Sequence, residues 1–91
     1  MAVSIRIPTP MRNLTGGEAL VSVEATTLSD AIKALDATHP GVAERVLDES
    51  GALRRFVNVY VGDEDVRFLD GLDTQLSDGA SISIIPAVAG G

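Results

Sequence analysis

The residues best suited to chemistry stand at the end of the sequence, where Gly90 and Gly91 follow the short run Ala-Val-Ala at 87–89. This segment carries no charge besides its terminal carboxylate, and valine is its largest side chain. Five extended residues reach about 17 Å, and glycine, which lacks a Cβ, fits a narrow channel. We therefore expect residues 87–91 to form a flexible tail that carries the Gly91 carboxylate into another protein's active site.

Three other groups of residues are of types that could bind ligands or act in catalysis, but their neighbours in the sequence do not support such a role. His39 lies at the expected end of a helix, where an imidazole usually contacts solvent or the last carbonyls. The acidic run 63–65 lacks the spaced ligands of a calcium loop. Gly16 and Gly17 are followed by neither Lys-Ser nor a helix, which is typical of a turn rather than a phosphate-binding loop. We assign these residues no catalytic, metal-binding or cofactor-binding role.

The composition excludes several classes of function. Without cysteine, the chain has no disulfide, thiolate nucleophile or cysteine zinc site, and its single histidine excludes a His-rich metal site. The net charge of -6 argues against binding nucleic acid, which requires clustered basic residues. A length of 91 residues allows one core and leaves no second domain to close over a substrate.

No stretch approaches the ~20 apolar residues of a membrane-spanning helix. Residues 1–10 contain no apolar run of signal-peptide length. These two features predict a cytoplasmic protein.

The tail needs a folded domain to position it, and the first half of that domain is predicted to be two strands and a helix. Residues 3–7 and 20–24 alternate apolar and polar side chains, which predicts a hairpin around the glycine turn. Thr27 is a suitable N-cap. Apolar residues then recur at helical spacing up to about Ala37, namely Leu28, Ala31, Ile32 and Leu35. Pro40 ends this helix, and a short helical turn is expected over 42–47.

Strands dominate the second half. They are expected over 56–61, 66–68 and 81–85, and Pro86 closes the last one. Strands on both sides of one helix predict an α+β fold with the helix laid across one face of the sheet. The chain thus divides into a domain over residues 1–86 and a tail over residues 87–91.

The charges near the end of the sequence are all acidic. After Arg67 the only charged side chains are Asp70, Asp73 and Asp78. This pattern predicts an acidic neighbourhood for the tail and a basic docking face on its partner.

With this order of elements and the Gly-Gly end, the chain resembles the ubiquitin-like sulfur carriers of the ThiS and MoaD type. The resemblance covers nearly the whole chain and is most specific over residues 78–91. The runs at 15–17, 55–61 and 63–68 are similar to those of carriers in the thiocarboxylate-dependent pathway to cysteine. This resemblance implies a β-grasp fold, with a mixed four- to five-stranded sheet and one main helix across one face.

The resemblance further implies a protein co-substrate rather than an enzyme. A ubiquitin-activating-type adenylating enzyme would use ATP to activate the Gly91 carboxylate, which sulfur then converts to a thiocarboxylate. A pyridoxal-phosphate cysteine synthase using O-phosphoserine would accept this sulfur, and a zinc peptidase would release the cysteine. All these cofactors belong to the partners and none to this chain. The residues implied to contact the partners are Pro86, Ala87, Val88, Ala89 and Gly90.

The same terminal glycines fit other functions. They are also typical of the small subunit of a molybdopterin synthase and of carriers that supply sulfur to thiamin or to secondary metabolites. A ubiquitin-like modifier would instead use Gly91 for isopeptide bonds, and a binding module would use only its surface.

Overall fold

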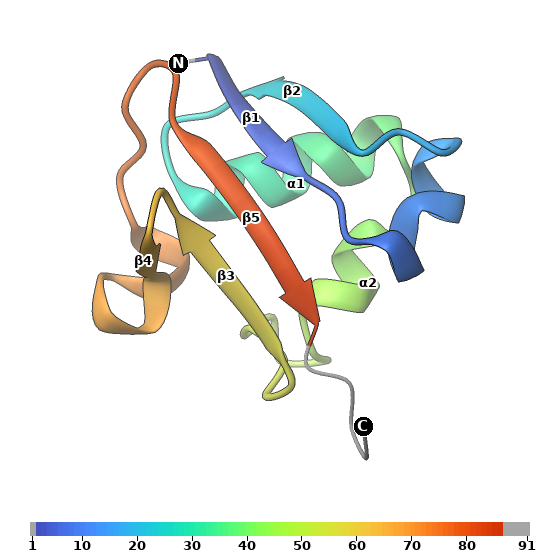
Figure 1. Cartoon of the computed structure of the whole chain (residues 1–91). Helices are drawn as coiled ribbons and strands as arrows, with labels where there is room; N and C mark the ends of the chain where they lie inside the picture. Colours follow the sequence, from blue (N-terminus) through green and yellow to red (C-terminus); the bar gives the residue numbers. More distant parts are fainter. Residues whose placement is uncertain (1, 87–91) are drawn as a thin grey trace.

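Five strands form one mixed sheet in the computed structural model, which describes residues 2–86. The strands are β1 (Ala2–Arg6), β2 (Leu20–Glu24), β3 (Val57–Val61), β4 (Glu64–Asp65) and β5 (Ser81–Pro86). Their order in the sheet is β2-β1-β5-β3-β4, so that β5 lies in the centre (Figure 1). β5 runs parallel to β1 and antiparallel to β3, while β1 and β2 are antiparallel. The predicted pairing of the first two strands is thus confirmed.

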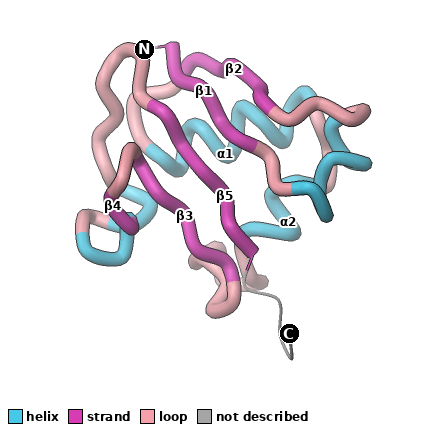
Figure 2. The backbone as a smooth tube through the Cα atoms, in the orientation of Figure 1, coloured by secondary structure: helices cyan, strands magenta, loops and turns pink. Residues whose placement is uncertain are grey.

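Two helices, α1 (Leu28–Thr38) and α2 (Val42–Val46), lie on the same face of this sheet (Figure 2). The strands bury every second side chain against them, as in the central pair Ile5 and Ile82, which are neighbours across β1 and β5. From α1 the core receives the four residues that helical spacing selected, Leu28, Ala31, Ile32 and Leu35, all buried. The core is therefore a single aliphatic layer between the helices and one face of the sheet.

The start of α1 follows the predicted capping. Thr27 has extended backbone angles, and its Oγ1 accepts a hydrogen bond of 3.2 Å from the Asp30 amide. At the other end, Asp36 Oδ1 accepts hydrogen bonds from the amides of Gly41 and Ala43, both at 3.1 Å. These contacts tie α1 to the first turn of α2.

The structure corrects the prediction of a strand at 66–68. The short strand is Glu64–Asp65, and Val66–Phe68 forms a 3-10 helix. Asp65 is the cause, because its carboxylate accepts a hydrogen bond from the Arg67 amide at 2.9 Å and caps that helix. A second 3-10 helix over Thr9–Thr15, which the alternating pattern did not indicate, stands between β1 and β2.

Within residues 2–86, no helix has the length and apolar character needed to cross a membrane.

Candidate functional site

The part of the predicted site that the structure describes is the end of β5. This strand ends at Pro86, as expected, and Pro86 lies opposite Val57 of β3. The preceding Ile85 lies opposite Asn58. β1 pairs with β5 only as far as Ser83, so β3 alone pairs with the last residues of the strand that leads into the tail. The other predicted site residues, Ala87, Val88, Ala89, Gly90 and Gly91, lie outside the described residues.

Arg67 fastens the segment opposite the end of β5. Its Nη1 donates a hydrogen bond of 2.7 Å to Asn58 Oδ1. Its Nη2 donates to the carbonyl oxygens of Arg54 and Val57, both at 2.8 Å. On its outer edge, β3 pairs with only the two residues of β4. The Arg67 guanidinium therefore donates hydrogen bonds to backbone carbonyls that lie beyond the reach of this short strand. Arg67 thereby fixes the segment against which Ile85 and Pro86 pair.

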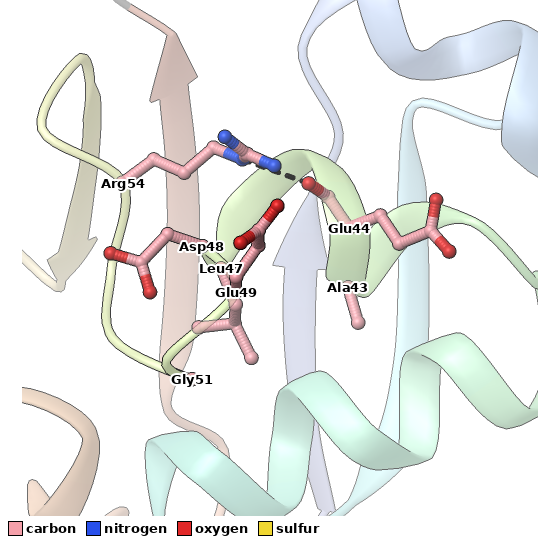
Figure 3. A pocket seen from close by; sticks show the side chains of 7 residues that line it. All are labelled: Ala43, Glu44, Leu47, Asp48, Glu49, Gly51 and Arg54. Carbon is pink, nitrogen blue, oxygen red and sulfur yellow. Dashed lines mark hydrogen bonds between the residues drawn. The ribbon is translucent and has the colours of Figure 1, made fainter.

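Arg54 holds the same segment to the helical layer. Its Nε donates a hydrogen bond of 2.8 Å to the Glu44 carbonyl of α2 (Figure 3). A hollow of about 500 Å3 lies here, lined by Ala43, Glu44, Leu47, Asp48, Glu49, Gly51 and Arg54. Three carboxylates and one arginine line it, which gives it no excess of positive charge for an anionic cofactor.

The loop between α2 and β3 is organised around Asp48. Asp48 Oδ1 accepts hydrogen bonds from the Ser50 amide at 2.9 Å, the Ser50 hydroxyl at 2.6 Å and the Ala52 amide at 3.1 Å. The Ser50 hydroxyl bond contributes most to a pKa of Asp48 below its ordinary value of 3.8, followed by the Ala52 amide. The charged carboxylate therefore shapes the loop beside the start of the tail.

Of the carboxylates expected near the tail, Asp78 lies at the end of the sheet away from Pro86, while the tail itself lies outside the described residues. Asp78 Oδ1 accepts a hydrogen bond from the Ala2 amide at 2.9 Å, which places Asp78 at the start of β1 and β5. Asp73 lies at this end too, because the neighbouring Thr74 carbonyl accepts a bond from the amide of Leu28, the first residue of α1. The six residues of β5 separate this end from Pro86 by roughly 17–20 Å. Closeness in sequence therefore does not bring Asp78 close to Pro86, because β5 carries the chain across the sheet.

His39, Gly16 and Gly17, to which we assigned no functional role, lie at a helix end and in a turn. His39 ends α1 and its amide donates to the Leu35 carbonyl at 2.8 Å. Gly16 and Gly17 both have positive φ, 65° and 91°, in the turn after the 3-10 helix at Thr9–Thr15. Within residues 2–86 no three His, Cys, Asp or Glu side chains are grouped to hold a metal ion.

With this geometry, the chain can be compared with known proteins. A model described as the ThiS family matches residues 5–91. The chain belongs to the ThiS family. One relative is the sulfur carrier protein CysO from Mycobacterium tuberculosis. It is 52% identical to this chain over 93 residues, and the match covers 100% of both chains.

Two further proteins resemble this ThiS-family chain over nearly its whole length. In the crystal structure of the BexX/CysO complex from Amycolatopsis orientalis, one chain is 45% identical and superposes with a TM-score of 0.92, covering 98% of this chain and 99% of that one. Small archaeal modifier protein 3 from Haloferax volcanii is 34% identical over 94 residues, again with 100% of both chains covered. The β-grasp fold is thereby confirmed, and the chain is a small ubiquitin-like carrier rather than an enzyme.

Proposed function

We propose that the chain carries sulfur as a thiocarboxylate on Gly91 and delivers it for cysteine biosynthesis. One observation carries the proposal: the 52% identity to a sulfur carrier named CysO extends over the whole length of both chains, and so includes the Gly-Gly end. The geometry supports it, since β3 pairs with β5 as far as Pro86, where the tail starts.

The chemistry requires activation of a poor acyl donor. A carboxylate cannot expel oxide, so an adenylating partner first joins it to the AMP moiety of ATP and pyrophosphate leaves. Hydrosulfide then attacks the acyl carbon and AMP leaves, which gives a thiocarboxylate. If a persulfide attacks instead, the product is an acyl disulfide, and a second thiol must cleave its S–S bond to release the thiocarboxylate and leave a disulfide. The thiocarboxylate is a stronger nucleophile than the original carboxylate. The carrier supplies the terminal carboxyl group, and the partner supplies the catalytic groups.

The division of the chain follows from this role. The domain over residues 1–86 is recognised by the partner, and the tail over residues 87–91 extends into the active site. Pro86, Ala87, Val88, Ala89 and Gly90 line the path to that site, and the small size of most of them fits a narrow channel.

The remaining partners belong to the same proposal. A pyridoxal-phosphate cysteine synthase that uses O-phosphoserine accepts the sulfur, and a zinc peptidase releases the cysteine, all in the cytoplasm. The solved BexX/CysO complex supports a carrier of this kind that docks on a second protein.

A reconstitution in two stages tests the proposal. The purified chain is incubated with its adenylating partner, ATP and sulfide, and its intact mass is measured. O-phosphoserine and the cysteine synthase are then added. We expect exchange of one oxygen for sulfur in the first stage and a cysteine adduct on the chain in the second. Loading without transfer would refute the cysteine pathway alone, whereas failure to load would refute the carrier function.

Conjugation to proteins is a second candidate function. The 34% identity to a protein named small archaeal modifier protein 3 favours it. A modifier would leave Gly91 linked to lysine side chains. Peptides carrying that linkage in digests of cell extract would support conjugation, and their absence from cells that contain the loaded carrier would exclude it.

A further inference from the structure

The end of β5 is supported by a neighbouring strand on one side only. β1 pairs with β5 as far as Ser83, so residues 84–86 pair with β3 alone. The last of these pairs joins Pro86 to Val57. Because the tail starts at this pair, the contacts that hold the pair also set the place from which the tail leaves the domain.

This last pair is held from outside β5. Pro86 has no N–H to donate to β3. The Val57 amide donates a hydrogen bond of 3.1 Å to the Arg54 carbonyl, and the Val57 carbonyl accepts one of 2.8 Å from Arg67 Nη2. A residue whose two backbone groups both face away from the neighbouring strand belongs to a pair that exchanges no backbone hydrogen bonds. The position of Val57 therefore depends on its partners outside β5.

Arg67 joins these partners through one guanidinium group. Its Nη2 also donates to the Arg54 carbonyl at 2.8 Å, and its Nη1 donates to Asn58 Oδ1 at 2.7 Å. Asn58 lies opposite Ile85, and opposite side chains in an antiparallel pair lie side by side on one face of the sheet. Arg67 thus holds the residues that face both Ile85 and Pro86.

Arg67 is itself held in place to do this. It lies in the 3-10 helix Val66–Phe68, and its amide donates a hydrogen bond of 2.9 Å to the carboxylate of Asp65, the N-cap of that helix. β4 cannot replace it, because β4 pairs only with Tyr60 and Val61. In the part of the chain that the structure describes, no strand pairs with residues 57–59 on this outer edge.

We propose that Arg67 is a positioning residue for sulfur loading. Through Val57 and Asn58 it holds Pro86, and so directs the tail toward the active site of the docked adenylating partner. This inference rests on the proposed function. Without Arg67 the end pairs of β3 and β5 fray, and two more residues join the five of the tail. The extra length alone lowers the effective concentration of the Gly91 carboxylate by less than about twofold, so a larger loss of rate reports lost direction.

Loading kinetics separate positioning from folding. ATP-dependent thiocarboxylate formation by the adenylating partner is measured against carrier concentration for wild type, Arg67→Ala and Arg67→Lys. The Arg67 side chain is exposed, so its removal leaves no cavity in the core. The control Ile32→Val removes a buried methylene group from α1 and alters no group bonded to Arg67.

A loss in kcat with little change in KM is the expected signature. We expect Arg67→Ala to lower kcat roughly three- to tenfold, with KM for the carrier within about twofold of wild type. Arg67→Lys should recover part of kcat, because an ammonium group can replace some of the donors but not the planar fork. Ile32→Val should keep both values within about twofold, although urea titration shows that it is destabilised too.

Two further measurements follow the proposed route. Asn58→Ala should lower kcat less than Arg67→Ala, and the double variant should load like Arg67→Ala alone, because both substitutions remove the same contact. The nuclear Overhauser effect between the α-protons of Val57 and Pro86, whose Cα atoms are about 4.5 Å apart in a pair of this type, should weaken in Arg67→Ala and persist in Ile32→Val.

The outcomes separate this inference from the carrier function. If the partner never loads wild type, the carrier function fails, and the positioning role fails with it. If wild type loads normally and Arg67→Ala has the same kcat as Ile32→Val, the positioning role alone is refuted. A raised KM with unchanged kcat in Arg67→Ala would place Arg67 in docking instead and would also overturn it. So would an α-proton contact that persists in Arg67→Ala, or additive losses in the double variant.

Discussion

At the scale of single residues, two side chains outside the tail determine how its starting point is held. Arg67 binds three acceptors on the segment that leads into β3, and Asp48 binds three donors in the loop before it. Neither residue was selected from the sequence. An arginine that follows a short strand gives no sign that its side chain folds back along the neighbouring strand.

Replacing Arg67 tests its fastening role. Arg67→Ala leaves three acceptors without their charged donor, so we expect the free energy of unfolding to fall by about 1–3 kcal/mol in urea titrations. Arg67→Lys should recover only part of this loss, because an ammonium group lacks the planar fork. The control Arg55→Ala should change it by less than about 0.5 kcal/mol. Equal losses for Arg67→Ala and Arg55→Ala would contradict the fastening role.

Asp48 should make stability depend on pH. Its pKa is lower in the folded chain than its ordinary value of 3.8, so the folded state binds this proton less tightly than the unfolded state. The resulting stabilisation is present above the ordinary value and is lost as the pH falls through the lowered pKa. Asp48→Asn should therefore melt at a lower temperature than wild type at neutral pH, and the difference should vanish in strong acid. Glu49→Gln controls for net charge, and an identical pH profile for it would contradict this explanation.

At the scale of elements, the sequence predicted those parts whose signals are local. The spacing of Leu28 to Leu35 and the Thr27 cap located α1. Period-two alternation located β1, β2 and β5, and a high content of β-branched and aromatic residues located β3, each to within about a residue. The short strand was predicted at 66–68, but it lies at Glu64–Asp65. Asp65 caps the 3-10 helix that follows, and a run of so few residues is too short to show a periodic pattern. The pairing of Ile5 with Ile82 joins distant segments and depends on tertiary packing, so the sheet order was beyond sequence patterns.

The packing of α1 can be tested with one substitution. Leu35 has no exposed surface, so Leu35→Ala removes buried methyl groups and leaves a cavity. We expect a loss of about 2–5 kcal/mol in the free energy of unfolding. The neighbouring control Lys33→Ala, on the exposed side of the helix, should change it by less than about 0.5 kcal/mol. A loss below 1 kcal/mol for Leu35→Ala, on the order of a surface change, would show that α1 does not close the core as described.

At the scale of the whole molecule, the chain has two ends of different character. At one end Asp78 lies beside Ala2 at the start of β5, and at the other Pro86 lies opposite Val57 where the tail starts. The sequence correctly predicted that the chain is a carrier rather than an enzyme. It did not show that Asp78 and Pro86 lie at opposite ends of the sheet, since only the path of β5 reveals that separation.

The central claim is that sulfur is attached at Gly91, and fragmentation of the intact loaded chain in a mass spectrometer tests it most directly. Wild type and a variant lacking Gly91 are each incubated with the adenylating partner, ATP and sulfide. We predict that wild type exchanges one oxygen for sulfur and that only fragments containing Gly91 carry the sulfur. The shortened variant should stay unloaded while unfolding at the same temperature as wild type. Sulfur elsewhere in the chain, or equal loading of the shortened variant, would contradict the account.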